Sequence, residues 1–245
     1  GSALAASTNN PDRVYGIMWA TSAVGDSTLF IVAPYATEAF GYPGLFWMMA
    51  VFVVINTPFL FLLVQLGNSA SEDATSLLIK PSDNKPGLYC LFGIFIYFVG
   101  VGSFWAFSEQ IALDLVGIDP VVAGEIFAVA IISGFVASLL AALIGSKIRR
   151  GIPIFFSVIL TLIACVWSIQ TRDQTVFSVL FLLYLFAVYF FAPYSLAIAA
   201  SLDNTGALAA RSAGLIVLGT AIGPMFSGIL IDFFGYVALN WFMAL

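Results

Sequence analysis

Long apolar stretches constrain the fold of this chain more than any other feature of its sequence. Only 9% of the 245 residues are charged and 62% are hydrophobic, whereas about 25% of the residues of a soluble domain carry a charge. So few charges cannot coat a water-facing surface, and lipid is expected to cover much of the chain. Seven stretches have the length that a helix needs to cross a bilayer. They cover residues 14–35, 45–66, 88–107, 121–144, 152–170, 176–200 and 213–231.

These stretches predict an all-α, polytopic helical membrane protein. Lipid offers no partner for backbone N–H and C=O groups, and the two-residue alternation of a membrane barrel is absent from the sequence. Asp119 and Pro120 predict an N-cap followed by a proline in the first turn, and Pro153 predicts a similar start for the fifth span. A further apolar run begins at Val237 and continues to the last residue. It is too short to span the bilayer, so we expect a chain truncated at both ends.

Composition argues against several classes of protein. The chain has no histidine, the commonest metal ligand and neutral-pH base, so neither a metal site nor a cofactor is expected. A net charge of −5 without a basic stripe argues against nucleic acid. No Gly-x-x-x-x-Gly-Lys-Ser/Thr loop occurs, which argues against ATP driving within this chain. Cys90 and Cys165 lie in apolar stretches and are expected to be buried small hydrophobes.

Positive residues predict the orientation. If the segment before the first span is cytoplasmic, alternate connections share that side, and Arg172 is the one basic residue that lies outside. The inside residues are then Arg13, Lys80, Lys85, Lys147, Arg149, Arg150 and Arg211. This bias predicts an integral protein of the plasma (inner) membrane, with residues 67–87, 145–151 and 201–211 in the cytoplasm.

A segment near the start of the chain recurs near its end, at an offset of 194 residues. Residues 38–50 align without gaps on residues 232–244, and Gly25 falls on Gly219. Identical residues pair at Phe40/Phe234, Gly41/Gly235, Tyr42/Tyr236, Leu45/Leu239, Trp47/Trp241, Met49/Met243 and Ala50/Ala244. The repeating unit is therefore six helices, and an even unit preserves orientation, as in transporters with two parallel halves. The alternative origin of the match is the enrichment of aromatic residues at membrane interfaces.

With this repeat and three short motifs, the chain resembles the major facilitator superfamily, from about the fifth helix to the start of the twelfth. Residues 145–151 resemble the family's glycine-and-arginine loop, although its acidic residue is absent; the gating loop implied by this comprises Gly145, Lys147, Arg149, Arg150 and Gly151. The glycine–proline pattern of the eleventh helix is matched by Gly219, Gly223, Pro224 and Gly228. Trp105-Ala-Phe-x-Glu109 resembles a motif at the outer end of the seventh helix.

The resemblance implies a major-facilitator-type bundle of two six-helix halves that rock about a central site. Residues 1–66 would be the last two helices of the N-terminal half, 67–87 the cytoplasmic central loop, and 88–245 the C-terminal half with an incomplete last helix. The implied function is secondary active transport of a small solute, coupled to protons. The implied partners are the lipid bilayer, the solute, protons and the missing N-terminal helices of the same protein.

Asp26 is the first candidate for the substrate or proton pathway. It lies about 18 Å into a hydrocarbon core roughly 30 Å thick, where an ionised group costs on the order of 2.5–3.5 kcal/mol. Trp19 and Ser22 share its helix face. We interpret Asp26 as a proton- or cation-responsive carboxylate. The alternative is a structural carboxylic acid, neutral by burial and bonded to a neighbouring Ser or Thr.

Other candidates lie on the third and sixth spans. Glu109 and Gln110, beside Trp105, are placed by the resemblance on a cavity-lining helix, but an acid near the interface can also reach water cheaply. Asp114 and Glu125 flank the same outer loop and are expected to be solvated. The sixth span carries tyrosines that either stack against a solute or form a lipid-facing wall. These are Tyr184, Tyr189 and Tyr194.

Small residues recur every four positions on the fourth span, at 134, 138 and 142 and at 137, 141 and 145. Such faces let helix backbones approach closely, and the resemblance implies that this span meets the first span. Arg211 is expected to be a topology anchor. Three alternative functions are a seven-helix receptor or scaffold, an intramembrane enzyme and a channel. The sequence offers neither a catalytic constellation nor a filter loop for the last two.

Overall fold

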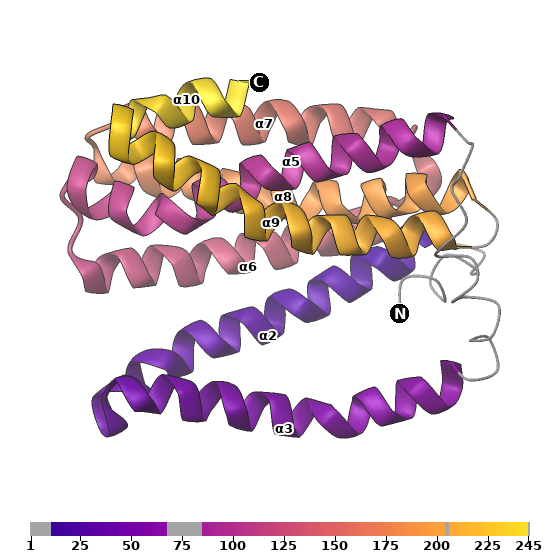
Figure 1. Cartoon of the computed structure of the whole chain (residues 1–245), viewed down its shortest axis with the longest axis horizontal. Coiled ribbons are helices and arrows are strands. Elements are labelled where there is room, and N and C mark those ends of the chain that lie inside the picture. Colours follow the sequence, from indigo (N-terminus) through magenta and orange to yellow (C-terminus); the bar gives the residue numbers. More distant parts are fainter. Residues whose placement is uncertain (1–10, 68–84, 204–205, 245) are drawn as a thin grey trace.

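The computed structural model describes residues 11–67, 85–203 and 206–244, which are helical apart from short connections and contain no strand. Five of the helices are long and apolar enough to cross a membrane: α5 with its extension η1, α6, α7, α8 and α9. The prediction of an all-α, polytopic membrane bundle is therefore confirmed (Figure 1). The elements are α2 (Pro11–Phe40), α3 (Tyr42–Gly67), α5 (Lys85–Gln110), η1 (Ile111–Val116), α6 (Pro120–Ile144), η2 (Gly145–Lys147), α7 (Gly151–Gln170), α8 (Gln174–Ser201), α9 (Ala207–Phe234) and α10 (Val237–Ala244). The expected central loop at 67–87, with Lys80, lies mostly outside the described residues.

Local sequence explains where the helices begin and end. The Asp119 carboxylate accepts a bond of 2.9 Å from the Val121 amide, and Pro120 opens α6, as predicted. α7 begins at Gly151 with Pro153 in its first turn, also as predicted. The third span is longer than its apolar stretch, because α5 continues into the π-helix η1 and stops only at Gly117, in the left-handed region.

The helix α8 lies at the centre of the bundle. It packs on α6, α7, α2, α9 and α5, and its side chains are buried along most of its length. Around Phe181 the rings are closely packed, with Phe127 at 4.5 Å and Tyr184 at 5.7 Å between centroids. This aromatic core holds α5, α6 and α8 together at a fixed spacing.

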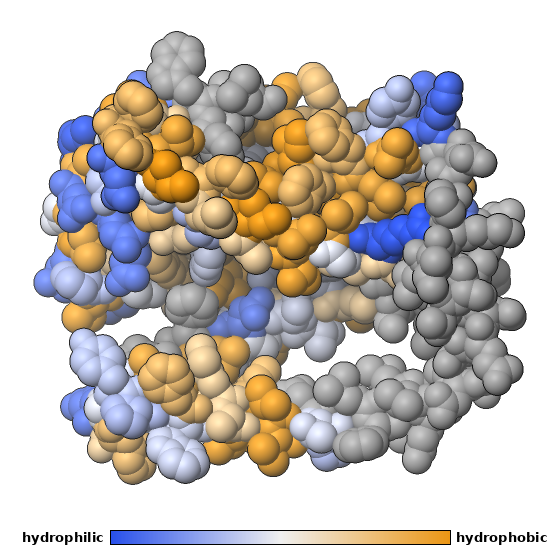
Figure 2. Space-filling view, in the orientation of Figure 1, coloured by the Kyte–Doolittle hydropathy of each residue, from blue (hydrophilic) through white to orange (hydrophobic). Residues whose placement is uncertain are grey.

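The two ends of the bundle carry opposite charge. The helices α2, α5 and α9 begin at one end, which we call the basic end, and it carries Arg13, Lys85, Lys147, Arg149, Arg150 and Arg211. At the other, the acidic end, the described residues include seven carboxylates and one basic residue, Arg172. The seven are Glu38, Glu109, Asp114, Asp119, Glu125, Asp173 and Asp232, all exposed. Figure 2 shows polar side chains at both ends of the molecule and an apolar band between them.

Two corners at the acidic end have the same backbone geometry. Gly41 joins α2 to α3 and Gly235 joins α9 to α10, with φ values of 66° and 71°. Each glycine N–H donates 2.8 Å to the carbonyl four residues before it, and each glycine carbonyl accepts from the amide three residues after it. These glycines belong to the segment that repeats at an offset of 194 residues. The repeat in sequence is thus also a repeat in local structure.

Small residues allow two helix pairs to approach closely. A Cβ on Gly16 would lie 2.7 Å from the Ala142 Cβ and 2.8 Å from its amide nitrogen, so α2 and α6 meet backbone to backbone. On α9, Gly219 and Gly223 lie against the α5 backbone at Phe95 and Val99. The predicted glycine–proline pattern has two further residues. Pro224 lies inside α9, and Gly228 faces the ring of Phe107 rather than a backbone.

The helix α3 stands apart from the bundle and contacts α2 among the described elements (Figures 1 and 2). Most of its described apolar side chains are exposed, with Phe46, Trp47 and Val54 between 68% and 74% exposed. Apolar groups exposed all round a helix indicate a lipid-covered or protein-covered segment.

Candidate functional site around Asp26

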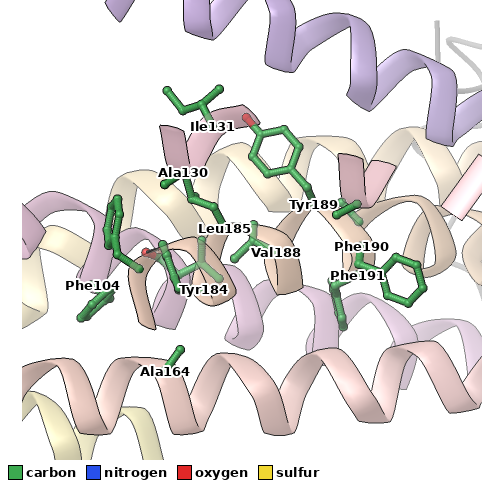
Figure 3. Close-up of a cluster of buried hydrophobic side chains, with 14 of the residues drawn as sticks. Phe104, Ala130, Ile131, Ala164, Tyr184, Leu185, Val188, Tyr189, Phe190 and Phe191 are labelled. Atoms are coloured by element: carbon green, nitrogen blue, oxygen red, sulfur yellow. Dashed lines mark hydrogen bonds between the residues drawn. The ribbon is translucent and has the colours of Figure 1, made fainter. Parts of the chain in front are cut away.

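The Asp26 carboxylate meets α8 in the middle of the bundle. The Tyr189 hydroxyl donates a hydrogen bond of 2.9 Å to Asp26 Oδ2, across 163 residues of chain. Figure 3 shows that the Tyr189 ring points away from those of Phe190 and Phe191, with its hydroxyl directed outward from α8. In this direction the hydroxyl can reach Asp26 on α2. Asp26 is half-buried, whereas Tyr189 is 9% exposed. The bond therefore joins a partly accessible carboxylate to a fixed donor.

Aromatic rings surround this bond. The Trp19 ring lies 5.5 Å from Tyr189 in an edge-to-face arrangement and 6.4 Å from Phe98 on α5. From Phe98 the rings continue to Phe191 at 6.1 Å and then to Tyr97, which is stacked on Phe191 at 3.8 Å. Three helices that are distant in sequence thus contribute to one carboxylate-and-aromatic site. The fold brings together three residues that the sequence predicted as candidates: Asp26, Trp19 and Tyr189.

The backbone of α6 sets the position of Tyr189. Gly134 faces the tyrosine ring, and a Cβ there would lie 2.8 Å from the ring carbon Cδ2. Four residues later, the Ser138 hydroxyl donates to the Tyr189 carbonyl at 3.3 Å. The small residues of α6 therefore face α8 at these positions and α2 at Ala142. The sequence indicated the small residues but not that one of them fits against a candidate site residue.

Ser22 lies on the same helix as Asp26 but bonds elsewhere. Its hydroxyl donates 3.0 Å to the Trp19 carbonyl, within α2, and its side chain is exposed. Such back-bonding satisfies the hydroxyl without a ligand. No contact in the structure joins Ser22 to the Asp26 carboxylate.

The other candidates lie away from Asp26. Glu109 and Gln110 are exposed at the acidic end of α5, while Trp105 packs inside the bundle, stacked on Phe181 at 6.0 Å. Tyr184 is fully buried and donates 2.8 Å to the Val101 carbonyl. Tyr194 is also fully buried, and its hydroxyl has no hydrogen-bond partner among the described residues. Of the three tyrosines, Tyr189 is the one bonded to a candidate acid.

An ion pair at the basic end was not foreseen from sequence. Arg150 donates from Nε to Asp12 Oδ1 at 2.9 Å and from Nη2 to Asp12 Oδ2 at 2.8 Å, and from Nη1 to the Ala197 carbonyl at 3.2 Å. Asp12 is 1% exposed. One guanidinium therefore ties the start of α2 to the end of α8 with bidentate geometry. The only signal in the sequence was an acid in the first turn of an apolar helix.

The rest of the 145–151 segment is arranged around that arginine. Gly145 is buried with φ of 51° and ends α6, while Gly151 opens α7. Lys147 and Arg149 are exposed at the basic end. Arg150 is thus the basic residue of this segment that reaches into the bundle.

At the acidic end, the α9–α10 corner is tied to η1. The Tyr236 hydroxyl donates 2.7 Å to Asp114 Oδ2. Burial, together with the bond to this carboxylate and its negative charge, raises the pKa of Tyr236 to about 12. The tyrosine therefore stays a neutral donor to Asp114 over the ordinary range of pH.

A separate pocket of about 640 Å³ lies between α5, α7 and α9. Its lining is largely apolar, with one polar contact at its wall, where the Tyr97 hydroxyl and Thr161 Oγ1 are 2.8 Å apart. The free Cys165 is buried beside them. The short helix α10 packs on the same three helices. Among the described residues, no three side chains of the His, Cys, Asp and Glu types lie close enough together to hold a metal.

Comparison with protein-family models gives no match for this chain, and comparison with curated protein sequences gives none either.

Proposed function

We propose that this protein is a secondary transporter of the major facilitator type, which moves a small solute by alternating access and couples it to protons through Asp26. The observation that carries the proposal is a carboxylate bonded to Tyr189, near the middle of the apolar helix α8, and bordered by the Trp19 ring. Ionisable groups at such depth are costly and occur mainly on ion and substrate pathways. Asp26 is favoured over Glu109, because Glu109 is exposed at the acidic end.

The glycine corners support two parallel halves. The α2–α3 and α9–α10 corners have the same pattern of hydrogen bonds, and both lie at the acidic end of the bundle. We therefore assign α2 and α3 to the end of one half. The helices α5 to α10 are then assigned to the second half, and the recurrence predicts equivalents of α5 to α8 before α2 in the whole protein. The close contact of α2 with α6 would lie between the halves.

The charges of the ends support the orientation. Basic residues gather on the cytoplasmic side of membrane proteins, so the basic end is assigned to the cytoplasm and the acidic end to the outside of the plasma membrane. In this assignment Arg150 and Asp12 close the cytoplasmic side when paired. Opening that side would require their bidentate contact to break.

Solute-dependent proton flux tests the proposal. The full-length protein is reconstituted into liposomes that contain a pH-sensitive dye, and a panel of neutral, anionic and cationic solutes is added outside. At least one solute is expected to change the internal pH, and Asp26→Asn is expected to abolish that change. Of the elements packed against α2, α8 presents Tyr189 to Asp26, so Tyr189→Phe is measured alongside.

Glu109→Gln is the matched control, because it removes a carboxylate that lies exposed at the acidic end. It is expected to keep the solute-dependent pH change. Wild-type proton flux in Asp26→Asn, with the variant reconstituted to the same amount, would contradict coupling through Asp26. The absence of any solute-dependent flux or uptake by the wild-type protein would contradict transport.

A further inference from the structure

The charge of Asp26 has no cation of the protein beside it among the described residues. Each described lysine and arginine lies in a connection or in the first two turns of a helix. Arg150, the one that reaches inward, is already bonded to Asp12. The Asp26 carboxylate accepts one hydroxyl bond, from Tyr189. Whenever this carboxylate carries its charge within the membrane, a positive partner offsets its desolvation, and no described lysine or arginine lies beside it.

The aromatic side chains beside Asp26 suit a particular kind of partner. Trp19 is half-buried and lies in edge contact with Tyr189, while Phe98 closes the site from α5. A carboxylate combined with the face of an indole attracts a cation that also has apolar substituents, because the ring quadrupole and the carboxylate both favour positive charge. An anion would be repelled by the carboxylate at this position.

The acidic end of the bundle also favours cations over anions. Its seven exposed carboxylates against one arginine, among the described residues, give it a negative potential. Such a field concentrates cations and disfavours anions before they bind. Six of the seven acids lie on elements other than α2, and the seventh, Glu38, lies twelve residues beyond Asp26, at the end of the helix.

We infer that the solute of this transporter is a monovalent organic cation, a protonated amine or a quaternary ammonium, which pairs with Asp26 and stacks on Trp19. The inference rests on the proposed function and narrows it to one chemical class. The acidic end would gather the cation, and the site around Asp26 would bind it.

Direct binding tests this without any need for transport. The purified full-length protein in detergent is titrated with three radiolabelled cations of increasing size: tetramethylammonium, tetraethylammonium and tetraphenylphosphonium. Tetraphenylborate, which has nearly the shape of tetraphenylphosphonium and the opposite charge, is the matched ligand control. At least one cation is expected to bind saturably, and the borate is not.

Variants locate the binding. Asp26→Asn is expected to weaken cation binding by about 10- to 100-fold, whereas Asp26→Glu keeps the charge and much of the affinity. Trp19→Leu is expected to weaken it by about 2- to 30-fold, with a smaller loss in Trp19→Phe. Asp173→Asn, an exposed acid of the acidic end, leaves equilibrium affinity within about twofold in physiological salt, because screening is strong there.

The outcomes separate the two proposals. If none of the cations binds saturably, or if one binds equally well to Asp26→Asn and wild type, the cation assignment is wrong. If a neutral or anionic solute drives proton flux through Asp26 in liposomes, transport stands and the cation assignment falls. If cations bind in an Asp26-dependent way but no solute moves across the liposome membrane, the cation site stands and the transport proposal falls.

Discussion

At the scale of single residues, the Asp12–Arg150 pair joins distant parts of the chain by two hydrogen bonds and an ion pair. Arg150→Leu is expected to lower the free energy of unfolding by about 3 kcal/mol, because it leaves Asp12, at 1% exposure, without its partner. Asp12→Asn should cost less, since Arg150 is 24% exposed and can reach water. Denaturant titration of the full-length protein in mixed micelles measures both.

Two comparisons make this prediction specific. Arg149→Leu removes an exposed neighbouring arginine and is expected to change stability little. The double variant Asp12→Asn with Arg150→Leu should recover part of the loss, because no buried charge is left alone. A double variant less stable than the sum of the two single losses would contradict the pairing.

At the scale of helices, the approach of α2 to α6 depends on Gly16. Gly16→Ala is expected to lower the free energy of unfolding by about 1–3 kcal/mol, because its Cβ would overlap Ala142 and force the two backbones apart. Gly25→Ala, on the same helix, places its Cβ at an ordinary 3.8 Å from the Phe52 ring. It should be neutral or slightly stabilising through helix propensity.

Thermal unfolding of the two variants, followed by tryptophan fluorescence, distinguishes packing from propensity. The expected order of midpoints is Gly25→Ala at or above wild type and Gly16→Ala below it. Equal midpoints for the two variants would mean that α2 and α6 do not meet at Gly16 in the folded protein.

At the scale of the whole molecule, the orientation can be tested by labelling. In a protein with Cys90 and Cys165 replaced by alanine, single cysteines are introduced as Ser146→Cys at the basic end and Thr175→Cys at the acidic end. Both native positions are exposed. A membrane-impermeant maleimide on intact cells is expected to label Thr175→Cys, and Ser146→Cys only after the membrane is opened. The reverse pattern would invert the assignment of the two ends.

Much of the helical architecture was predictable, because its causes are local. Apolar length predicted the five helices from α5 to α9 that are long and apolar enough to span a membrane. Asp119 with Pro120 fixes the start of α6, and the glycines of the matching corners, Gly41 and Gly235, belong to the repeat. The candidate site was predictable in part. Helical spacing put Trp19 and Asp26 on one face, but it also put Ser22 there, whose hydroxyl bonds to its own helix.

The rest depends on which helices become neighbours, and a single sequence does not state that. Asp12 and Arg150 are separated by 138 residues and Asp26 and Tyr189 by 163. Arg150 was marked as part of the 145–151 loop and Asp12 as an acid in the first turn of a helix, but nothing in the sequence pairs the two. Likewise, Gly134 looks like any small residue of a packing face until the Tyr189 ring lies against it.

The helix α2 is held to the bundle from its start to its middle. Asp12, Gly16 and Asp26 contact the bundle, whereas Gly25, Ala36 and Gly44 mark its contacts with α3, and the helix diverges from α6 toward the acidic end (Figure 1). From the Gly16 crossing to Phe40 the helix extends about 36 Å. A tilt of about 10° at that crossing would carry its far tip, and α3 with it, through an arc of about 6 Å. Gly16 therefore has the position of a fulcrum: a small rotation there is magnified into a displacement large enough to admit or exclude a small molecule at the opposite end.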